Sequence, residues 1–156
     1  MRELQVRNRK RDRTLNAKFV RELTRALLEE ELGLANYALG ISFISASRMA
    51  EINREYLQHE GSTDVITFDY REGYGAGSES SELAGEIYIS MSDARRQARE
   101  FRTRWEAEVV RYIVHGVLHL RGYDDVTAAK RRVMKREENR LLRRLKRRCD
   151  FRAVAG

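Results

Sequence analysis

One apolar run dominates the second half of the chain and constrains every fold that the sequence can adopt. Positions 105–120 read WEAEVVRYIVHGVLHL, and apolar side chains fall on nearly every side of the helix that this stretch predicts. A helix that is apolar all round is normally buried. Gly122 follows the run and favours a helix end, because glycine adopts the left-handed conformation without strain. We therefore expect the core to be built around this helix.

The rest of the sequence supplies shorter elements to surround it. Stretches rich in β-branched and aromatic residues predict strands, at 4–7, 41–45, 64–68 and 86–89. Polar residues ahead of apolar residues at helical spacing predict helix starts, at Asn16, Ser47, Ser92 and Thr127. Residues 72–82 are rich in glycine and serine and predict a loop. The order predicts an α/β (α+β) fold with a single mixed sheet of about four strands packed with helices. We expect one domain over 1–156, with a basic C-terminal helix at 127–149.

Charge is distributed unevenly along the chain, whose net charge is +7. Residues 1–13 hold six basic and two acidic side chains, and residues 130–152 hold twelve and three, whereas the middle is acidic. A basic head and tail suggest a polyanionic partner, with nucleic acid the first candidate, although solvated helix surfaces give the same pattern. No stretch approaches the roughly 20 apolar residues that span a bilayer, and no signal peptide is apparent. We expect a cytoplasmic protein without a membrane partner.

Two of the three histidines, His115 and His119, lie four residues apart on the apolar run. This spacing stacks both imidazoles on one helix face, so both can approach one ion. A catalytic zinc takes three protein ligands and keeps one position open. Asp124 and Asp125 follow the helix and offer the third ligand, with Asp125 favoured by its spacing. Two packed histidines are the alternative reading of the pair alone. Gly116 stands where a zinc protease of the HExxH type has its glutamate, so a metalloprotease is disfavoured.

These residues belong to a longer motif. Residues 115–125, HGVLHLRGYDD, resemble the signature of the YbeY endoribonucleases, H-G-x-L-H-L-x-G-Y-D-H, at every fixed position but the last. Two further segments agree with that family. Residues 53–68 resemble its N-x-x-Y…T-D/N-V-L-S-F segment through Asn53, Tyr56, 63–65 and Phe68, and residues 85–87 resemble its next strand. The order of elements agrees from about residue 4 to residue 145.

The resemblance implies a single-strand-specific, metal-dependent endoribonuclease. Proteins of this family act in the late maturation of the 3′ end of 16S rRNA in the small ribosomal subunit and in ribosome quality control. Carried over to this chain, the zinc ligands are His115, His119 and Asp125, one ion per chain. Manganese, nickel or iron also suit two imidazoles and a carboxylate. The partners that this implies are single-stranded RNA, above all rRNA, and the small subunit.

The chain departs from the family pattern at two positions. Asp125 replaces a histidine; aspartate binds zinc at a similar distance, so a site remains, with an extra negative charge. Leu57 stands where the family usually has an arginine after Tyr56. Arg54, three residues earlier on the expected helix, and His59, two residues later, are candidate catalytic replacements that could contact phosphate or transfer a proton. Either can equally be a surface residue.

Two other functions fit the sequence. A metal-stabilised RNA-binding factor could assist ribosome assembly with little or no nuclease activity, and both departures favour it. A hydrolase of another substrate could use the same scaffold; poor RNA binding beside a good metal site would indicate it. The sequence places the nuclease first and the assembly factor second.

Overall fold

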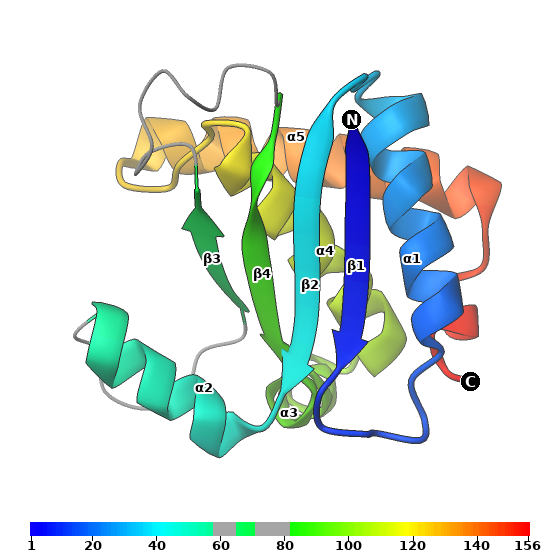
Figure 1. Cartoon of the computed structure of the whole chain (residues 1–156), viewed down its shortest axis with the longest axis vertical. Coiled ribbons are helices and arrows are strands. Elements are labelled where there is room, and N and C mark those ends of the chain that lie inside the picture. Colours follow the sequence, from blue (N-terminus) through cyan, green and yellow to red (C-terminus); the bar gives the residue numbers. More distant parts are fainter. Residues whose placement is uncertain (58–64, 71–81) are drawn as a thin grey trace.

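The computed structural model describes residues 1–57, 65–70 and 82–156, and four strands in this part form one mixed sheet (Figure 1). The strands are β1 (Arg2–Asn8), β2 (Tyr37–Ile44), β3 (Val65–Asp69) and β4 (Ala84–Ser90). Their order is β1–β2–β4–β3; the first three run parallel, and β3 pairs antiparallel with β4. The predicted fold class is thereby confirmed. The loop expected at 72–82 falls almost wholly outside the described residues.

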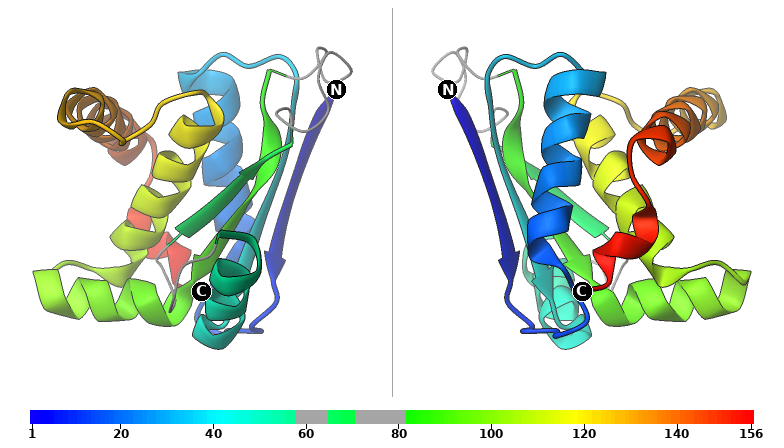
Figure 2. Two further views of the ribbon diagram at one scale, coloured as in Figure 1. Left: turned by 90° about the vertical axis from the view of Figure 1, so that its left-hand side faces the viewer. Right: turned by 90° about the vertical axis from the view of Figure 1, so that its right-hand side faces the viewer.

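Helices connect the strands and cover the sheet. They are α1 (Ala17–Arg25), which continues into η1 (Ala26–Glu31), α2 (Ala46–Ile52), which continues into η2 (Asn53–Leu57), α3 (Met91–Phe101), α4 (Trp105–Leu120), α5 (Ala128–Arg148) and η4 (Phe151–Val154). Figure 2 shows α1, α4 and α5 on the same side of the sheet, with α5 outside α4. α2 packs through Met49 and Ile52 against Ile44 and Ile66, in a small apolar cluster separate from the main core.

The apolar run forms α4, and this helix is the centre of the core, as predicted. Eleven of its sixteen residues are buried, and apolar side chains from the sheet, α1, η1 and α5 belong to the same cluster. Gly116 allows the close approach to β4, because a Cβ atom there would lie 2.8 Å from Cδ1 of the fully buried Ile87. In the part of the chain that the structure describes, no helix is both long and apolar enough to cross a membrane.

Side-chain caps explain where the helices begin. Asn16 caps α1 and Thr127 caps α5, as predicted, through hydrogen bonds to the backbone N–H three residues on. The predicted caps of α2 and α3 were wrong by two residues: the caps are Ser45 and Ser90, not Ser47 and Ser92. β2 ends at Ile44, directly before Ser45, and β4 ends at Ser90 itself, so no loop separates either strand from the helix that follows it.

Contacts from the N-terminal third hold α5 in place over α4. The Glu31 carboxylate is paired with Arg144 and Arg148 of α5, and its side chain is only 1% exposed. Beyond α5, the Asn16 N–H donates to the Val154 carbonyl at 2.8 Å. α5 is therefore fixed along its second half, and its first half forms one wall of the candidate site.

Candidate metal centre

The candidate metal centre lies at the C-terminal end of α4. His115 and His119 stand one turn apart, and their Nε2 atoms are 3.1 Å from each other. Gly122 follows with a φ of 102°, and the N–H groups of Gly122 and Tyr123 donate to carbonyls in the last turn of α4. This is the hydrogen-bond pattern of a Schellman turn, which ends the helix and reverses the chain. The reversed chain brings Asp125 back to the two histidines.

The structure brings the three predicted metal ligands together. One donor atom each from His115, His119 and Asp125 lie within 4.8 Å of one another. Asp124 is turned to other partners: its Oδ1 accepts from the Val126 N–H at 3.1 Å, and its Oδ2 lies 3.4 Å from the Lys130 ammonium. The geometry therefore favours Asp125 over Asp124 as the third donor.

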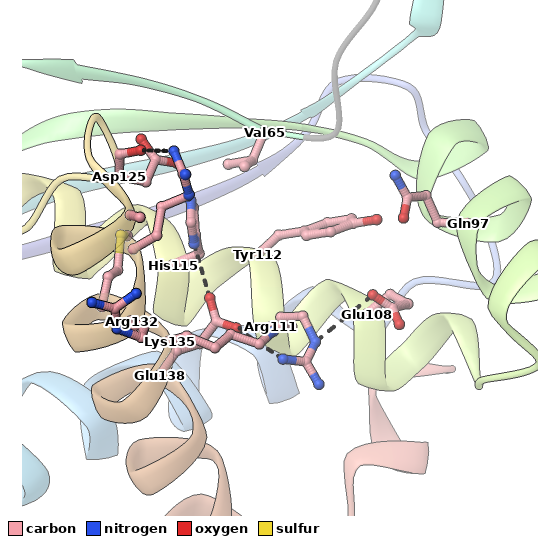
Figure 3. A pocket seen from close by; sticks show the side chains of 13 residues that line it. Val65, Gln97, Glu108, Arg111, Tyr112, His115, Asp125, Arg132, Lys135 and Glu138 are labelled. Atoms are coloured by element: carbon pink, nitrogen blue, oxygen red, sulfur yellow. Dashed lines mark hydrogen bonds and ion pairs between the residues drawn. The ribbon is translucent and has the colours of Figure 1, made fainter.

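The other ring nitrogen of His115 is held by Glu138 of α5. Glu138 Oε1 lies 2.8 Å from His115 Nδ1, and Oε2 accepts from Arg111 at 2.8 Å and from Lys135 at 3.1 Å (Figure 3). Burial opposes ionisation of this carboxyl, but the His115 hydrogen bond and the Lys135 and Arg111 charges outweigh it and bring its pKa to about 2. The ionised Glu138 accepts a hydrogen bond from Nδ1–H of His115. The free lone pair of the imidazole is then on Nε2, which faces His119.

The donor set fits a transition-metal ion. Metal–nitrogen and metal–oxygen bonds to zinc are about 2.0–2.2 Å long, so the donors of one tetrahedral ion lie roughly 3–4 Å apart. The two Nε2 atoms are 3.1 Å apart, which is in that range, and all three donors lie within 4.8 Å of one another. Burial lowers the pKa of His119, and the neighbouring His115 lowers it further. The imidazole is thus kept in the neutral form that binds a metal. A carboxylate that orients a metal-ligating histidine, as Glu138 does, is the usual outer partner in such sites.

A cavity of about 650 Å³ opens beside the donors, between α4 and α5. His115 and Asp125 reach it from one end, Val65 of β3 and Tyr112 line it, and three cations of α5 contribute to its wall (Figure 3). These cations are Arg131, Arg132 and Lys135, all exposed. The donors therefore face an open, basic cavity rather than a closed structural site.

The two predicted catalytic residues are not brought to this cavity by the described part of the chain. Arg54 is exposed in η2, which continues α2, and it does not line the cavity. His59 lies outside the described residues, and the side chain of Leu57 is not described either. A catalytic role for Arg54 or His59 therefore stays a prediction.

Sequence analysis missed Glu138 and Arg111. The signal for Glu138 was present: Met134, Glu138, Leu141 and Leu145 recur at helical spacing, and all four are buried. An acid within the apolar stripe of an otherwise basic helix requires a buried partner, and His115 with Arg111 provides it. Arg111 carried no such signal. It lies one turn before His115 on α4, but the sequence does not reveal which face of α4 packs against α5.

A Glu138→Gln variant tests the role of this contact. The amide keeps the size of the side chain but loses the charge that fixes the His115 tautomer, so we expect metal affinity to fall about 10- to 100-fold. Isothermal titration of the metal-free protein with zinc measures the change. Glu137→Gln is the matched control, because Glu137 is a neighbouring acid of α5 that pairs with Arg140. Equal affinities of the two variants would contradict a role for Glu138 in the site.

The fold and the site define a class: a single-sheet α/β protein with two histidines and a carboxylate gathered at the end of a buried helix, the donor set of an open metal site. Comparison with known proteins narrows the class. A family model described as "Endoribonuclease YbeY" matches residues 5–146. The chain belongs to this family.

Individual relatives agree with this assignment. Endoribonuclease YbeY of Chlorobium phaeovibrioides is 36% identical over 140 residues, which cover 90% of this chain and 88% of the relative. Endoribonuclease YbeY of Parabacteroides distasonis is 40% identical over 107 residues, covering 69% and 70%. A Thermotoga maritima protein solved in solution has the same fold, with a TM-score of 0.62 at 22% identity and coverage of 91% and 88%.

Proposed function

We propose that the protein is a zinc-dependent endoribonuclease that cuts single-stranded RNA in the cytoplasm, with His115, His119 and Asp125 as the metal ligands. Its substrate in this proposal is rRNA of the small subunit, in late maturation of the 16S 3′ end and in ribosome quality control. The observation that carries the proposal is the open donor set beside a cavity walled by cations. Membership of the endoribonuclease YbeY family supports the reaction type.

The side chains that line the cavity have different roles in this proposal. Arg131 and Arg132 hold a phosphodiester by its charge, since an arginine fork matches phosphate oxygens. Glu138 keeps His115 oriented, with Nδ1 protonated and Nε2 on the side of His119, where the two histidines and Asp125 would hold an ion. A divalent ion bound here would supply Lewis-acid polarisation of the scissile phosphate and lower the pKa of an attacking water. No separate protein base is then required, which agrees with Gly116 at the position of the protease glutamate.

The second candidate function is an RNA-binding ribosome assembly factor in which the metal only stabilises the fold. Leu57 favours it, because this apolar residue stands where the family usually has an arginine. Arg131 and Arg132 weigh against it, because they supply cations to the cavity from α5 instead. We therefore place the nuclease first.

The deciding experiment is cleavage of a single-stranded RNA by the zinc-loaded protein, repeated after removal of the metal with a chelator and after zinc is restored. We expect cleavage, loss and recovery in that order, with duplex RNA of the same sequence left intact. RNA that is bound but uncut at every metal loading would instead support the assembly factor. A protein that binds zinc but neither binds nor cuts RNA would contradict both functions. Manganese, nickel and iron loading in parallel identifies the active metal.

A further inference from the structure

The cavity at the metal centre is the first of three hollows that follow one another between α4 and α5. The second, of about 190 Å³, shares Arg111 with the first and is lined by Arg143 and Lys146. The third, of about 660 Å³, shares Ala107 and Lys146 with the second. We call this series the α4–α5 groove. From His115 to Ala107 it follows α4 for about 12 Å, at the helical rise of 1.5 Å per residue.

The walls of the groove are strongly basic. The cations come from both helices and from the residues that flank them: Arg104, Arg111, Arg131, Arg132, Lys135, Arg143, Lys146, Arg147, Arg148 and Arg152. Its acids are fewer, and most are already neutralised. Glu106 lies 3.3 Å from Arg104, and Asp150 lies 2.7 Å from Arg152. The groove therefore carries an excess of positive charge from the metal centre outward.

Several of these cations are available to a ligand. Among the described residues, no carboxylate lies within ion-pair distance of Arg132, Arg143 or Arg147, and all three are exposed. By contrast, Arg144 and Arg148 are paired with acids of η1. Long, exposed cations that line a hollow without partners favour binding of a polyanion.

We propose that the α4–α5 groove holds the RNA strand on one side of the scissile phosphate, by contacts to its phosphates and not to its bases. The proposal rests on the proposed function, since it places the substrate of that site. The middle hollow is the smallest of the three, at about 190 Å³, and in this proposal it admits one strand and not a duplex. The strand thereby reaches His115 along a fixed line, which positions one phosphate at the metal centre.

The residues that line the groove predict that RNA binding depends little on the base sequence of the RNA. Phe151 is the aromatic residue that lines the second and third hollows, and it is buried beneath the Lys146 ammonium, 5.9 Å from its ring centroid. A buried ring offers no face for a base to stack on. Phosphate contacts fix position and carry no sequence information. We therefore expect binding that depends on salt and on strand length far more than on base identity.

The test removes two groove cations and compares the result with an equal loss of charge elsewhere. The groove variant is Arg143→Gln with Arg147→Gln, two cations that line only the second and third hollows. The control variant is Lys18→Gln with Arg136→Gln, because these residues are exposed and line none of the three hollows. Fluorescence anisotropy of the zinc-loaded proteins, on ice and with the RNA checked to be intact, measures affinity for strands of about 4 and about 12 nucleotides.

We expect the groove variant to bind the longer strand roughly tenfold more weakly, with a salt slope lower by about 1.4, because each lost phosphate contact on a single strand removes about 0.7. The control variant should match the parent, and all three should bind the shorter strand alike. Arg143→Lys with Arg147→Lys should restore binding, since charge alone is required. Far-ultraviolet circular dichroism confirms that each variant is folded.

The outcomes separate the groove from the proposed nuclease activity. If the groove variant and the control bind the longer strand equally, the groove proposal is overturned, whatever the cleavage result. If the groove variant loses affinity while neither it nor the parent cuts RNA, the groove stands and the nuclease fails. Equal affinity of the parent for duplex and single-stranded RNA would also overturn the proposal, because it requires the middle hollow to admit a single strand only.

Discussion

An Asp125→Ala variant is expected to lose its bound metal and its RNA cleavage, while an Asp124→Ala variant keeps both. Asp125 shares a donor cluster with His115 and His119, whereas Asp124 caps the following turn and pairs with Lys130. Changes that only touch the surroundings of a metal ligand cost about 10- to 100-fold in affinity, so loss of a ligand should exceed 100-fold. Metal content by mass spectrometry and single-turnover RNA cleavage measure the two effects.

Asp124 provides a matched control for Asp125, because the two residues are adjacent. Both variants lose one negative charge within the same loop, so a general electrostatic effect would affect them equally. Thermal unfolding of the metal-free proteins shows whether either substitution disturbs the fold. If Asp124→Ala loses the metal and Asp125→Ala retains it, the assignment of the third ligand is wrong. If both retain the metal, the two histidines must bind it with a donor from elsewhere.

A Gly85→Ala variant is expected to lose about 3 kcal/mol of unfolding free energy, at the upper end of the range for overpacking. An added Cβ atom would meet the carbonyl oxygen of Phe68 in β3 and would lie 2.7 Å from Leu120 Cδ2. The Phe68 oxygen belongs to the backbone of a paired strand and cannot rotate away. Either β3 or the end of α4 must move, and the end of α4 carries His119. Urea unfolding of the metal-free protein measures the loss.

Gly40→Ala is the matched control in the neighbouring strand. There the added Cβ atom would meet only the carboxyl group of Glu86, a flexible side chain at the surface of the sheet. Glu86 can turn to solvent and lose its partly buried 3.5 Å pair with Arg7, and we expect the loss of so long a pair near the surface to cost no more than about 1 kcal/mol. We expect a change below about 1 kcal/mol. Similar losses at both glycines would show that the strand conformation, and not the close approach at Gly85, requires glycine.

Local signals explain how much of the fold could be predicted. The apolar run predicts α4 to the residue, since both its length and its burial follow from its own composition. β-Branched stretches locate all four strands within a few residues. The errors arise where two signals compete. Ser45 and Ser47 both suit a helix cap, and the prediction assigned Ser45 to the strand and Ser47 to the cap. The pairing of β2 with β4 ends at Ile44 and Ser90, which leaves Ser45 free to cap α2, and the sequence does not show where this pairing ends.

The candidate site divides in the same way. The spacing of His115 and His119 and the turn at Gly122 are local features, so the sequence alone predicts the three metal donors. Their partner Glu138 lies 23 residues beyond His115, on a helix whose packing on α4 no local pattern reveals. The α4–α5 groove could not be predicted at all. The charge run indicates a basic helix, but it does not show which of the cations line a hollow.

The ties between α5 and the start of the chain have a kinetic consequence. Glu31 and Arg144 are 113 residues apart, and the backbone of residues 14–16 is joined to that of 154–156. Contacts between such distant segments form slowly, because a long loop has to close before they gain anything. We therefore expect the second half of α5 to dock on η1 late in folding, after the first half of α5 has packed on α4 through contacts such as that of Glu138 with His115, 23 residues apart. A chain without these ties would hold α5 only by its contacts with α4, so Glu138 would orient His115 less firmly and we expect such a chain to bind metal more weakly.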